Sequence, residues 1–182
     1  MIDSKALIFK VLIIGSLGVG KQTLLNILLH DTNEIFNKAE TNKENIVHTS
    51  DVKIILYQRK LDDINYLIQF MKPPNLDSSQ IILHSFSEKS DGIILVFDIW
   101  TQETLEELQK FYLFNESQIK TIRKPIYMLL GNKCDLDEND LNQKRSKIPK
   151  KQITDFTNTI DGDFLKQARK QERMFKNLLM HS

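Results

Sequence analysis

The stretch of sequence that decides the fold is Gly15-Ser16-Leu17-Gly18-Val19-Gly20-Lys21-Gln22-Thr23. An apolar run, residues 7–14, precedes this stretch, and a helical pattern, residues 24–29, follows it. A glycine-rich loop between a strand and a helix lets successive backbone N–H groups point at phosphate oxygens, aided by the helix dipole. Lys21 then reaches the β- and γ-phosphates, whereas Gln22 stands where a Ser or Thr hydroxyl normally holds Mg²⁺. The stretch predicts a nucleotide-binding loop with an altered metal position.

A second motif, Asn132-Lys133-Cys134-Asp135, directly follows the apolar run 126–131. A carboxylate there accepts hydrogen bonds from the N1–H and the exocyclic amine of guanine, whereas adenine has an acceptor at N1. Asp135 is therefore expected to select guanine, with the stem of Lys133 along the base and with Asn132 tying the segment to the phosphate loop. The motif alone is weak evidence, because polar turns after strands are common. Its pairing with an upstream phosphate loop favours base recognition over a solvated turn.

Apolar runs alternate with amphipathic segments along the chain. Strands are expected over residues 7–14, 52–57, 64–70, 92–97 and 126–131, and helices over residues 21–29, 101–114 and 172–180. Strands that alternate with helices predict a three-layer α/β domain. Right-handed crossovers then place the phosphate loop at the carboxyl edge of the sheet, where such folds bind ligands. The polar stretches 30–50, 72–80 and 136–150 are expected to be long loops.

Composition excludes several classes of protein. The 182 residues suit one domain, and the 25 basic and 24 acidic residues nearly cancel, so nucleic acid is not an expected partner. One cysteine, Cys134, fits a reducing compartment. No apolar run approaches the roughly 18 residues of a membrane span, and the C-terminal residues lack the cysteine that a prenyl anchor needs. We therefore expect a cytoplasmic protein without a lipid anchor.

With both motifs in place, the chain resembles the Ras-superfamily small GTPases, and the Rab branch most of all. The similar segments are residues 15–23, 90–99 and 124–136. The resemblance implies an α/β, three-layer P-loop NTPase fold, a Ras-like G domain over residues 1–182. Its sheet is mostly parallel and six-stranded, with one antiparallel edge strand and helices on both faces. Ala168 is the match to a Ser-Ala-Lys motif in which the backbone N–H of the alanine meets the guanine O6.

The implied cofactor is GTP or GDP. The nucleotide-binding residues that follow from the loop, the second motif and the resemblance are Gly15, Gly18, Val19, Gly20, Lys21, Gln22, Thr23, Asn132, Lys133, Asp135 and Ala168.

The hydrolytic motif of the resembled family, Asp-x-x-Gly-Gln, has no match in this chain. Lys72, Asn75 and Leu76 stand at its three positions, and a one-residue slip in the alignment restores neither the Asp nor the Gly. Leucine has no group with which to orient water. Leu17 in addition crowds the place of the attacking water and of an arginine finger. We therefore assign no catalytic residue and expect little intrinsic GTP hydrolysis.

The metal site is weakened by the same departures. Gln22 offers an amide oxygen, and the Thr that senses the γ-phosphate is placed at Thr49, with Thr41 as the second choice. Both Gln22 and Thr49 are weak candidate ligands for Mg²⁺. Lys72 replaces a carboxylate, and its ammonium either points to solvent or partly neutralises the phosphates in place of the metal.

The leading hypothesis is an atypical Rab/Ras-like small GTP-binding protein that acts through protein effectors or complex subunits, in a trafficking, ciliary or signalling role. Two alternatives remain. One is an active GTPase switch that a regulator completes in trans, and the other is a nucleotide-free structural subunit of a larger complex.

Overall fold

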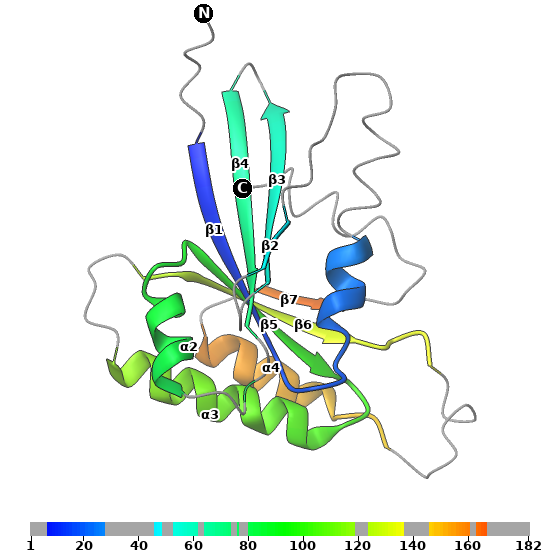
Figure 1. Ribbon diagram of the computed structural model, residues 1–182. Coiled ribbons are helices and arrows are strands. Elements are labelled where there is room, and N and C mark those ends of the chain that lie inside the picture. The colour runs from blue at the N-terminus through cyan, green and yellow to red at the C-terminus, as the bar shows by residue number, and fades with distance from the viewer. Residues whose placement is uncertain are drawn as a thin grey trace, which may run out of the picture.

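Seven strands of the described chain form one sheet in the computed structural model (Figure 1). The structure describes residues 7–27, 46–48, 53–61, 64–73, 76, 80–118, 124–136, 146–160 and 163–166. The strands are β1 (Leu7–Ile14), β2 (Ile46–His48), β3 (Lys53–Leu61), β4 (Ile64–Lys72), β5 (Gly92–Asp98), β6 (Ile126–Asn132) and β7 (Asp163–Lys166). The helices are a first helix described over residues 21–27, α2 (Gln80–Ser87), α3 (Gln102–Gln118) and α4 (Lys150–Thr159).

The order of the strands, β2-β3-β4-β1-β5-β6-β7, reverses around β1. β1 pairs in parallel with β4 on one side and with β5 on the other. The chain leaves β1 to build one half of the sheet and later returns to build the other half. Open α/β sheets bind ligands at such a switch point, beyond the carboxyl ends of the strands. The loop that follows β1 lies at this point.

Side chains alternate across the sheet and divide the core into two layers. In β1, Leu12 and Ile14 belong to one hydrophobic cluster and Ile13 to the other, because successive strand side chains point to opposite faces. The first cluster packs against α2, α3 and α4, and the second packs against the first helix through Leu24 and Leu25. Figure 1 shows these helices on the two sides of the sheet. Helices on both faces make the three-layer arrangement.

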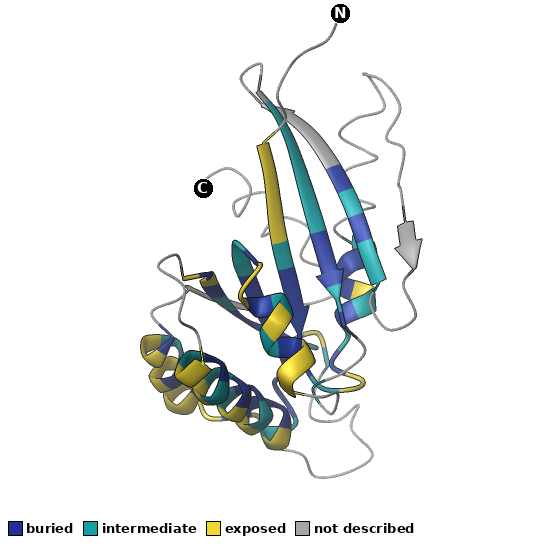
Figure 2. Cartoon of the chain, turned by 60° about the vertical axis from the view of Figure 1, so that its left-hand side comes forward, coloured by how far each residue is buried: buried dark blue, intermediate teal, exposed yellow. Residues whose placement is uncertain are grey.

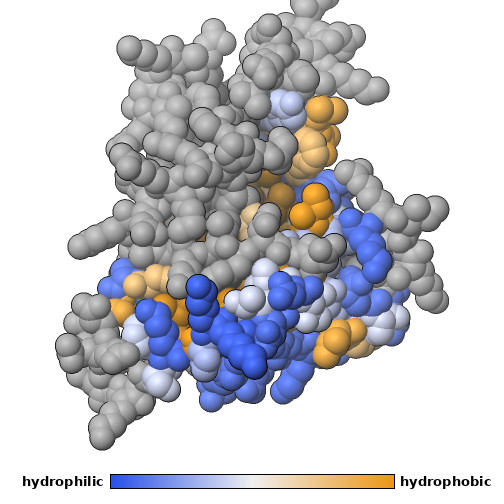
Figure 3. Space-filling model, turned by 180° about the vertical axis from the view of Figure 1, so that it is seen from behind, coloured by the Kyte–Doolittle hydropathy of each residue, from blue (hydrophilic) through white to orange (hydrophobic). Residues whose placement is uncertain are grey.

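Burial explains why the central strands are continuous apolar runs. β5 is buried along almost all of its length, as expected for a parallel strand covered on both faces. β1 passes from an exposed start to a fully buried end next to the phosphate loop (Figure 2). Seen from behind, the described side chains at the helical end of the molecule are mostly hydrophilic (Figure 3). Apart from the exposed Ile81, Ile82 and Leu113, the helices therefore turn their apolar side chains inward and solvate their outer faces.

The predicted fold class is confirmed, but two details of the sheet differ from the prediction. The sheet has seven described strands instead of six, because residues 46–48 of an expected loop pair with β3. β3 is antiparallel to both of its neighbours, so the antiparallel strand lies one position in from the edge. β3 and β4 form an antiparallel hairpin whose pairing reaches Leu61 opposite Ile64.

The sequence did not predict two of the helices, α2 and α4. Each begins at the last residue of a stretch that was expected to be a loop. The predicted helix over residues 172–180 lies outside the described residues. None of the helices in the described ranges combines the length and the apolar character that crossing a membrane requires.

A buried polar network joins α2, α3 and β6 beneath the helical layer. The Asn115 side chain is fully buried, and its Nδ2 donates to the Tyr127 hydroxyl at 2.8 Å. Its Oδ1 lies 2.8 Å from Nδ1 of His84 on α2 and accepts that hydrogen bond. The Tyr127 hydroxyl in turn donates to Glu116 at 3.3 Å. Each buried member thus has a partner, as a low-dielectric interior demands.

The stability of the protein should therefore depend on the protonation of Tyr127. Burial raises the pKa of the Tyr127 phenol, a hydrogen bond from Asn115 opposes this shift, and the Glu116 carboxylate adds to it. An unfolded tyrosine has a pKa of about 10. The raised folded pKa means that this contribution to stability is complete below that pH and is lost progressively as the pH rises above it.

We expect urea unfolding of the wild type between pH 9.5 and 11.5 to lose stability more steeply than that of Tyr127→Phe, by up to about 1.4 kcal/mol per pH unit. Parallel profiles for the two proteins would contradict this assignment.

Candidate functional site

The loop between β1 and the first helix has a backbone that only glycine tolerates at two positions. Gly18 and Gly20 have φ angles of +78° and +95°, in the left-handed region. A Cβ on Gly20 would also lie 2.3 Å from the Asn132 amide nitrogen, and one on Gly15 would lie 2.3 Å from the Val96 carbonyl oxygen. The glycines therefore allow both the curl of the loop and its close approach to the ends of β5 and β6.

Lys21 lies at the start of the first helix and is folded into this loop. Its side chain is buried, and its ammonium donates to the carbonyl of Gly15 and, at 2.7 Å, to that of Ser16. The Ser16 hydroxyl in turn donates to the Glu107 carboxylate on α3. The Lys21 ammonium, which is expected to meet phosphate, thus lies at the centre of the loop. A hydrogen bond from Ser16 to Glu107 joins the loop to α3.

Asn132 links the loop to the second motif. Its side-chain Nδ2 donates to the Val19 carbonyl at 2.7 Å in a fully buried hydrogen bond across 113 positions of sequence. The tie expected from the sequence is therefore present. It fixes the distance between the loop expected to hold phosphate and the segment expected to hold the base.

The neighbouring Lys133 is held by two residues at the end of β5. Its ammonium pairs with the Asp98 carboxylate at 2.8 Å, and its backbone carbonyl accepts the indole N–H of Trp100 at 3.1 Å. Its φ angle of +64° is unusual for a residue with a side chain. The sequence prediction included Lys133 and missed both Asp98 and Trp100. An aspartate that directly follows a buried strand at the ligand edge was the signal available for Asp98.

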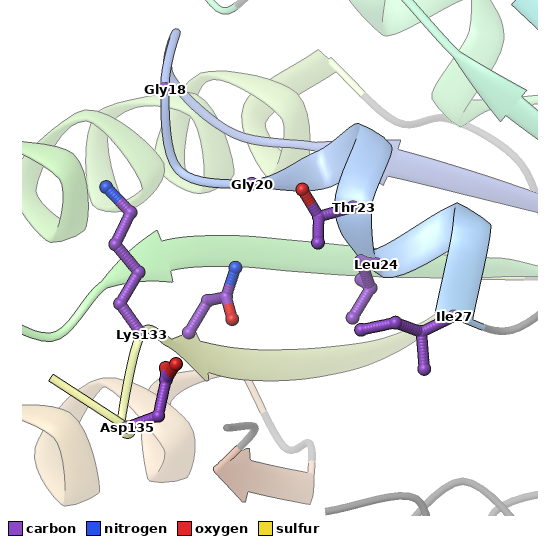
Figure 4. Close-up of a pocket in the computed structure, with 8 residues that line it drawn as sticks. Gly18, Gly20, Thr23, Leu24, Ile27, Lys133 and Asp135 are labelled. Atoms are coloured by element: carbon purple, nitrogen blue, oxygen red, sulfur yellow. The ribbon is translucent and has the colours of Figure 1, made fainter. Parts of the chain in front are cut away.

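A cavity of about 220 Å³ separates the loop from the second motif (Figure 4). Its lining residues are Gly18, Gly20, Thr23, Leu24, Ile27, Asn132, Lys133 and Asp135. Six of these were predicted as nucleotide-binding residues. Leu24 and Ile27 were not predicted, and they give the wall formed by the first helix an apolar face. Figure 4 shows Thr23, Leu24 and Ile27 on the helix across the cavity from the segment that carries Lys133 and Asp135.

A comparison of the sequence with known protein families identifies the family of this chain. A sequence model of the Ras family matches residues 10–181. The chain belongs to the Ras family. It is a divergent, Rab-like member, because mouse Ras-related protein Rab-7b is 30% identical over 136 residues, which cover 74% of this chain and 64% of that relative.

Other relatives of the Ras family give the same picture. GTP-binding protein YPT1 of Saccharomyces cerevisiae is 30% identical over 131 residues, 72% of this chain and 58% of the relative. Ras-related protein RIC1 of Oryza sativa is 28% identical over 132 residues, 72% of this chain and 60% of the relative. The chain thus spans less than two-thirds of the length of these relatives.

The residues that depart from the Ras-family pattern lie around the phosphate loop and the end of β4. The Gln22 amide donates to the Asn26 side chain at 2.9 Å on the exposed face of the first helix. Leu17 is 77% exposed at the tip of the loop. Leu76 packs against the first hydrophobic cluster, and Lys72 is half-buried at the end of β4. Thr49, Asn75 and Ala168 lie outside the described residues, so their roles stay predictions.

The tie between Asn132 and Val19 should contribute measurably to stability. Asn132→Ala leaves the buried Val19 carbonyl without its donor, and an unpaired buried carbonyl costs about 1–3 kcal/mol. We expect the free energy of unfolding, measured in urea, to fall by that amount. The matched control is Asn26→Ala on the exposed face of the first helix, which should change it by less than about 0.5 kcal/mol. Equal losses in the two variants would argue against a special role for the tie.

Proposed function

We propose that this chain binds GTP or GDP between the phosphate loop and the segment from Asn132 to Asp135, and that it hydrolyses GTP weakly or not at all. The observation that carries the proposal is the 2.7 Å hydrogen bond from Asn132 to Val19. It holds Asp135, a carboxylate suited to guanine, on the same cavity as the glycine-rich loop. One ligand with a base at one end and phosphates at the other fits this arrangement.

The phosphate end of the cavity has the features that an anion needs. The left-handed conformations of Gly18 and Gly20 curl the loop ahead of the first helix, and the N–H groups at a helix start attract phosphate. The Lys21 ammonium is already buried at the centre of the loop. Nucleotide phosphates would compete for this ammonium with the carbonyls of Gly15 and Ser16.

The metal position supports a weak site for Mg²⁺. Gln22 presents an amide where the family pattern has a hydroxyl, and its nitrogen is engaged with Asn26. Its amide oxygen is carried on a longer side chain than a serine or threonine hydroxyl. The near-ideal octahedral geometry that Mg²⁺ requires is therefore harder to reach. Thr49 remains the proposed second ligand. In the described residues, the half-buried Lys72 brings a cation, not a carboxylate, to the end of β4.

The same surroundings support poor hydrolysis. Leu76 stands where a glutamine would orient water, and it packs against the hydrophobic cluster instead. The exposed Leu17 adds an apolar side chain at the mouth of the loop. Activation by an arginine finger is worth about 10³–10⁵ in rate in this class of reaction, and Leu17 crowds the place where such a finger would enter.

We further propose that the chain acts through protein effectors or as a subunit of a larger assembly, in the cytoplasm. Two isoleucines at the start of α2, Ile81 and Ile82, are 74% and 48% exposed and offer apolar surface to such a partner. Relatives named as Rab proteins make a trafficking role the first one to test. A switch completed by a regulator in trans and a nucleotide-free subunit remain the alternatives that the next two experiments separate.

The first experiment concerns binding and base specificity. We expect the purified protein to release GTP or GDP on denaturation, as read by chromatography. Asp135→Asn should weaken guanine nucleotide binding and shift the preference towards xanthine nucleotides, because the amide N–H₂ can donate to the xanthine O2. Asp155→Asn on the exposed face of α4 is the matched control and should change neither. Unchanged GDP affinity in Asp135→Asn would refute the assignment of the base site.

The second experiment concerns hydrolysis. In a single-turnover assay with Mg²⁺, we expect a rate below about 3 × 10⁻⁴ s⁻¹, the intrinsic rate of Ras. Leu76→Gln alone should not restore the rate, since the residues expected to contact the metal-bound water and the γ-phosphate are also replaced. A rate equal to that of Ras would show that the enzyme is active.

A further inference from the structure

Asp98 lies at the carboxyl end of β5, beside the proposed base site, and its side chain is only 6% exposed. Its carboxylate accepts three hydrogen bonds, from the Trp100 backbone N–H at 3.0 Å, the Thr101 hydroxyl at 3.2 Å and the Lys133 ammonium at 2.8 Å. β5 and β6 are parallel neighbours, and Asp98 lies opposite Asn132 in their register. The end of β5 therefore directly adjoins the base-recognition segment.

Lys133 is held at both its side chain and its backbone. Asp98 takes the ammonium, and the indole of Trp100 donates to the carbonyl of Lys133 at 3.1 Å. Between these two contacts the backbone adopts a φ angle of +64°, which costs energy for any residue with a Cβ. Strained residues of this kind persist where the surroundings fix them from several sides, and they cluster at ligand sites.

Trp100 is itself fixed in place. Its side chain is 5% exposed, and the Lys147 ammonium lies 5.0 Å from the centre of its ring. The backbone N–H of Ile148 donates to the Ile99 carbonyl at 2.9 Å, which joins this segment to the end of β5. The end of β5 thus provides a rigid support for Lys133, and Asp135 follows two residues later on the same cavity.

We propose that Asp98 is a positioning residue for guanine recognition. By holding the Lys133 ammonium, it fixes the stem that flanks the base and the strained turn that presents Asp135. This inference rests on the proposed guanine nucleotide site and adds to it a residue that does not touch the ligand. The ordinary alternative is that Asp98 only stabilises the turn into α3, since its carboxylate also accepts the N–H of Trp100 and the hydroxyl of Thr101.

A double-mutant cycle separates the two roles. Asp98→Asn keeps an oxygen for the Trp100 N–H but removes the charge that holds Lys133, and Lys133→Met keeps the stem without the ammonium. The readout is the dissociation rate of a fluorescent GDP analogue. We expect Asp98→Asn to speed dissociation about tenfold in the wild-type background and less than about twofold in the Lys133→Met background. Equal factors in the two backgrounds would show that Asp98 acts only on the fold.

The matched control is Asp91→Asn. Asp91 precedes the other end of β5, where its carboxylate accepts the backbone N–H of Lys10 at 2.9 Å. This variant should leave the dissociation rate unchanged, and a tenfold effect there would attribute the Asp98 result to general loosening of β5.

Trp100 provides a second readout, because it is the one tryptophan of the chain. We expect its fluorescence to change when the GDP analogue binds and this change to be reduced in Asp98→Asn. Should Asp98→Asn fail to fold, Lys133→Met alone removes the ammonium that Asp98 holds and should likewise speed dissociation by about tenfold. An unaltered rate in that variant would then overturn the inference.

The failure of this inference can be told from failure of the proposed function. A wild-type protein that binds no guanine nucleotide overturns both. A wild type that binds the analogue, together with an Asp98→Asn variant of the same dissociation rate, overturns the positioning role alone.

Discussion

The hydrogen bond between the Asn132 amide and the Val19 carbonyl joins two parts of the chain that are far apart in sequence. Its geometry depends on Gly20, because a Cβ at that position would clash with the Asn132 amide nitrogen, 2.3 Å away. It also depends on the parallel pairing of β5 between β1 and β6, which sets the spacing of the strand ends. The arrangement of the loop and the motif around the cavity therefore depends on the hydrogen bond, on Gly20 and on the strand pairing.

The two ends of the cavity differ in how far they keep the Ras-family pattern. At the base end, Asn132, Lys133 and Asp135 are all present, and the structure supports them with a buried tie, an ion pair and an indole N–H. At the phosphate end, the cradle is intact, but Leu17 and Gln22 alter its rim. This asymmetry is the basis of the proposal that the chain retains a guanine nucleotide and hydrolyses GTP weakly.

The sequence allowed the central fold to be predicted because the buried strands are short and continuously apolar. β5 and β6 begin at the expected residues and extend one residue further than expected. α4 was missed because it opens with Lys150, Lys151 and Gln152, and only Ile153 and Phe156 within it are buried, which is a narrow apolar stripe. α2 was missed because two of its apolar residues, Ile81 and Ile82, face solvent and obscure the helical period. The sequence marks Asp98 only as an aspartate at the end of a buried strand, and its contact with Lys133 depends on the register of β5 and β6, which no local pattern reveals.

The network around Asn115 also restricts how α2 can move. The buried Asn115 amide depends on His84 for its oxygen and on Tyr127 for its nitrogen, and no described part of this side chain reaches water. A gradual displacement of α2 would strand that oxygen in the core at a cost of about 1–3 kcal/mol. A displacement of α2 that breaks this hydrogen bond without admitting water is therefore disfavoured.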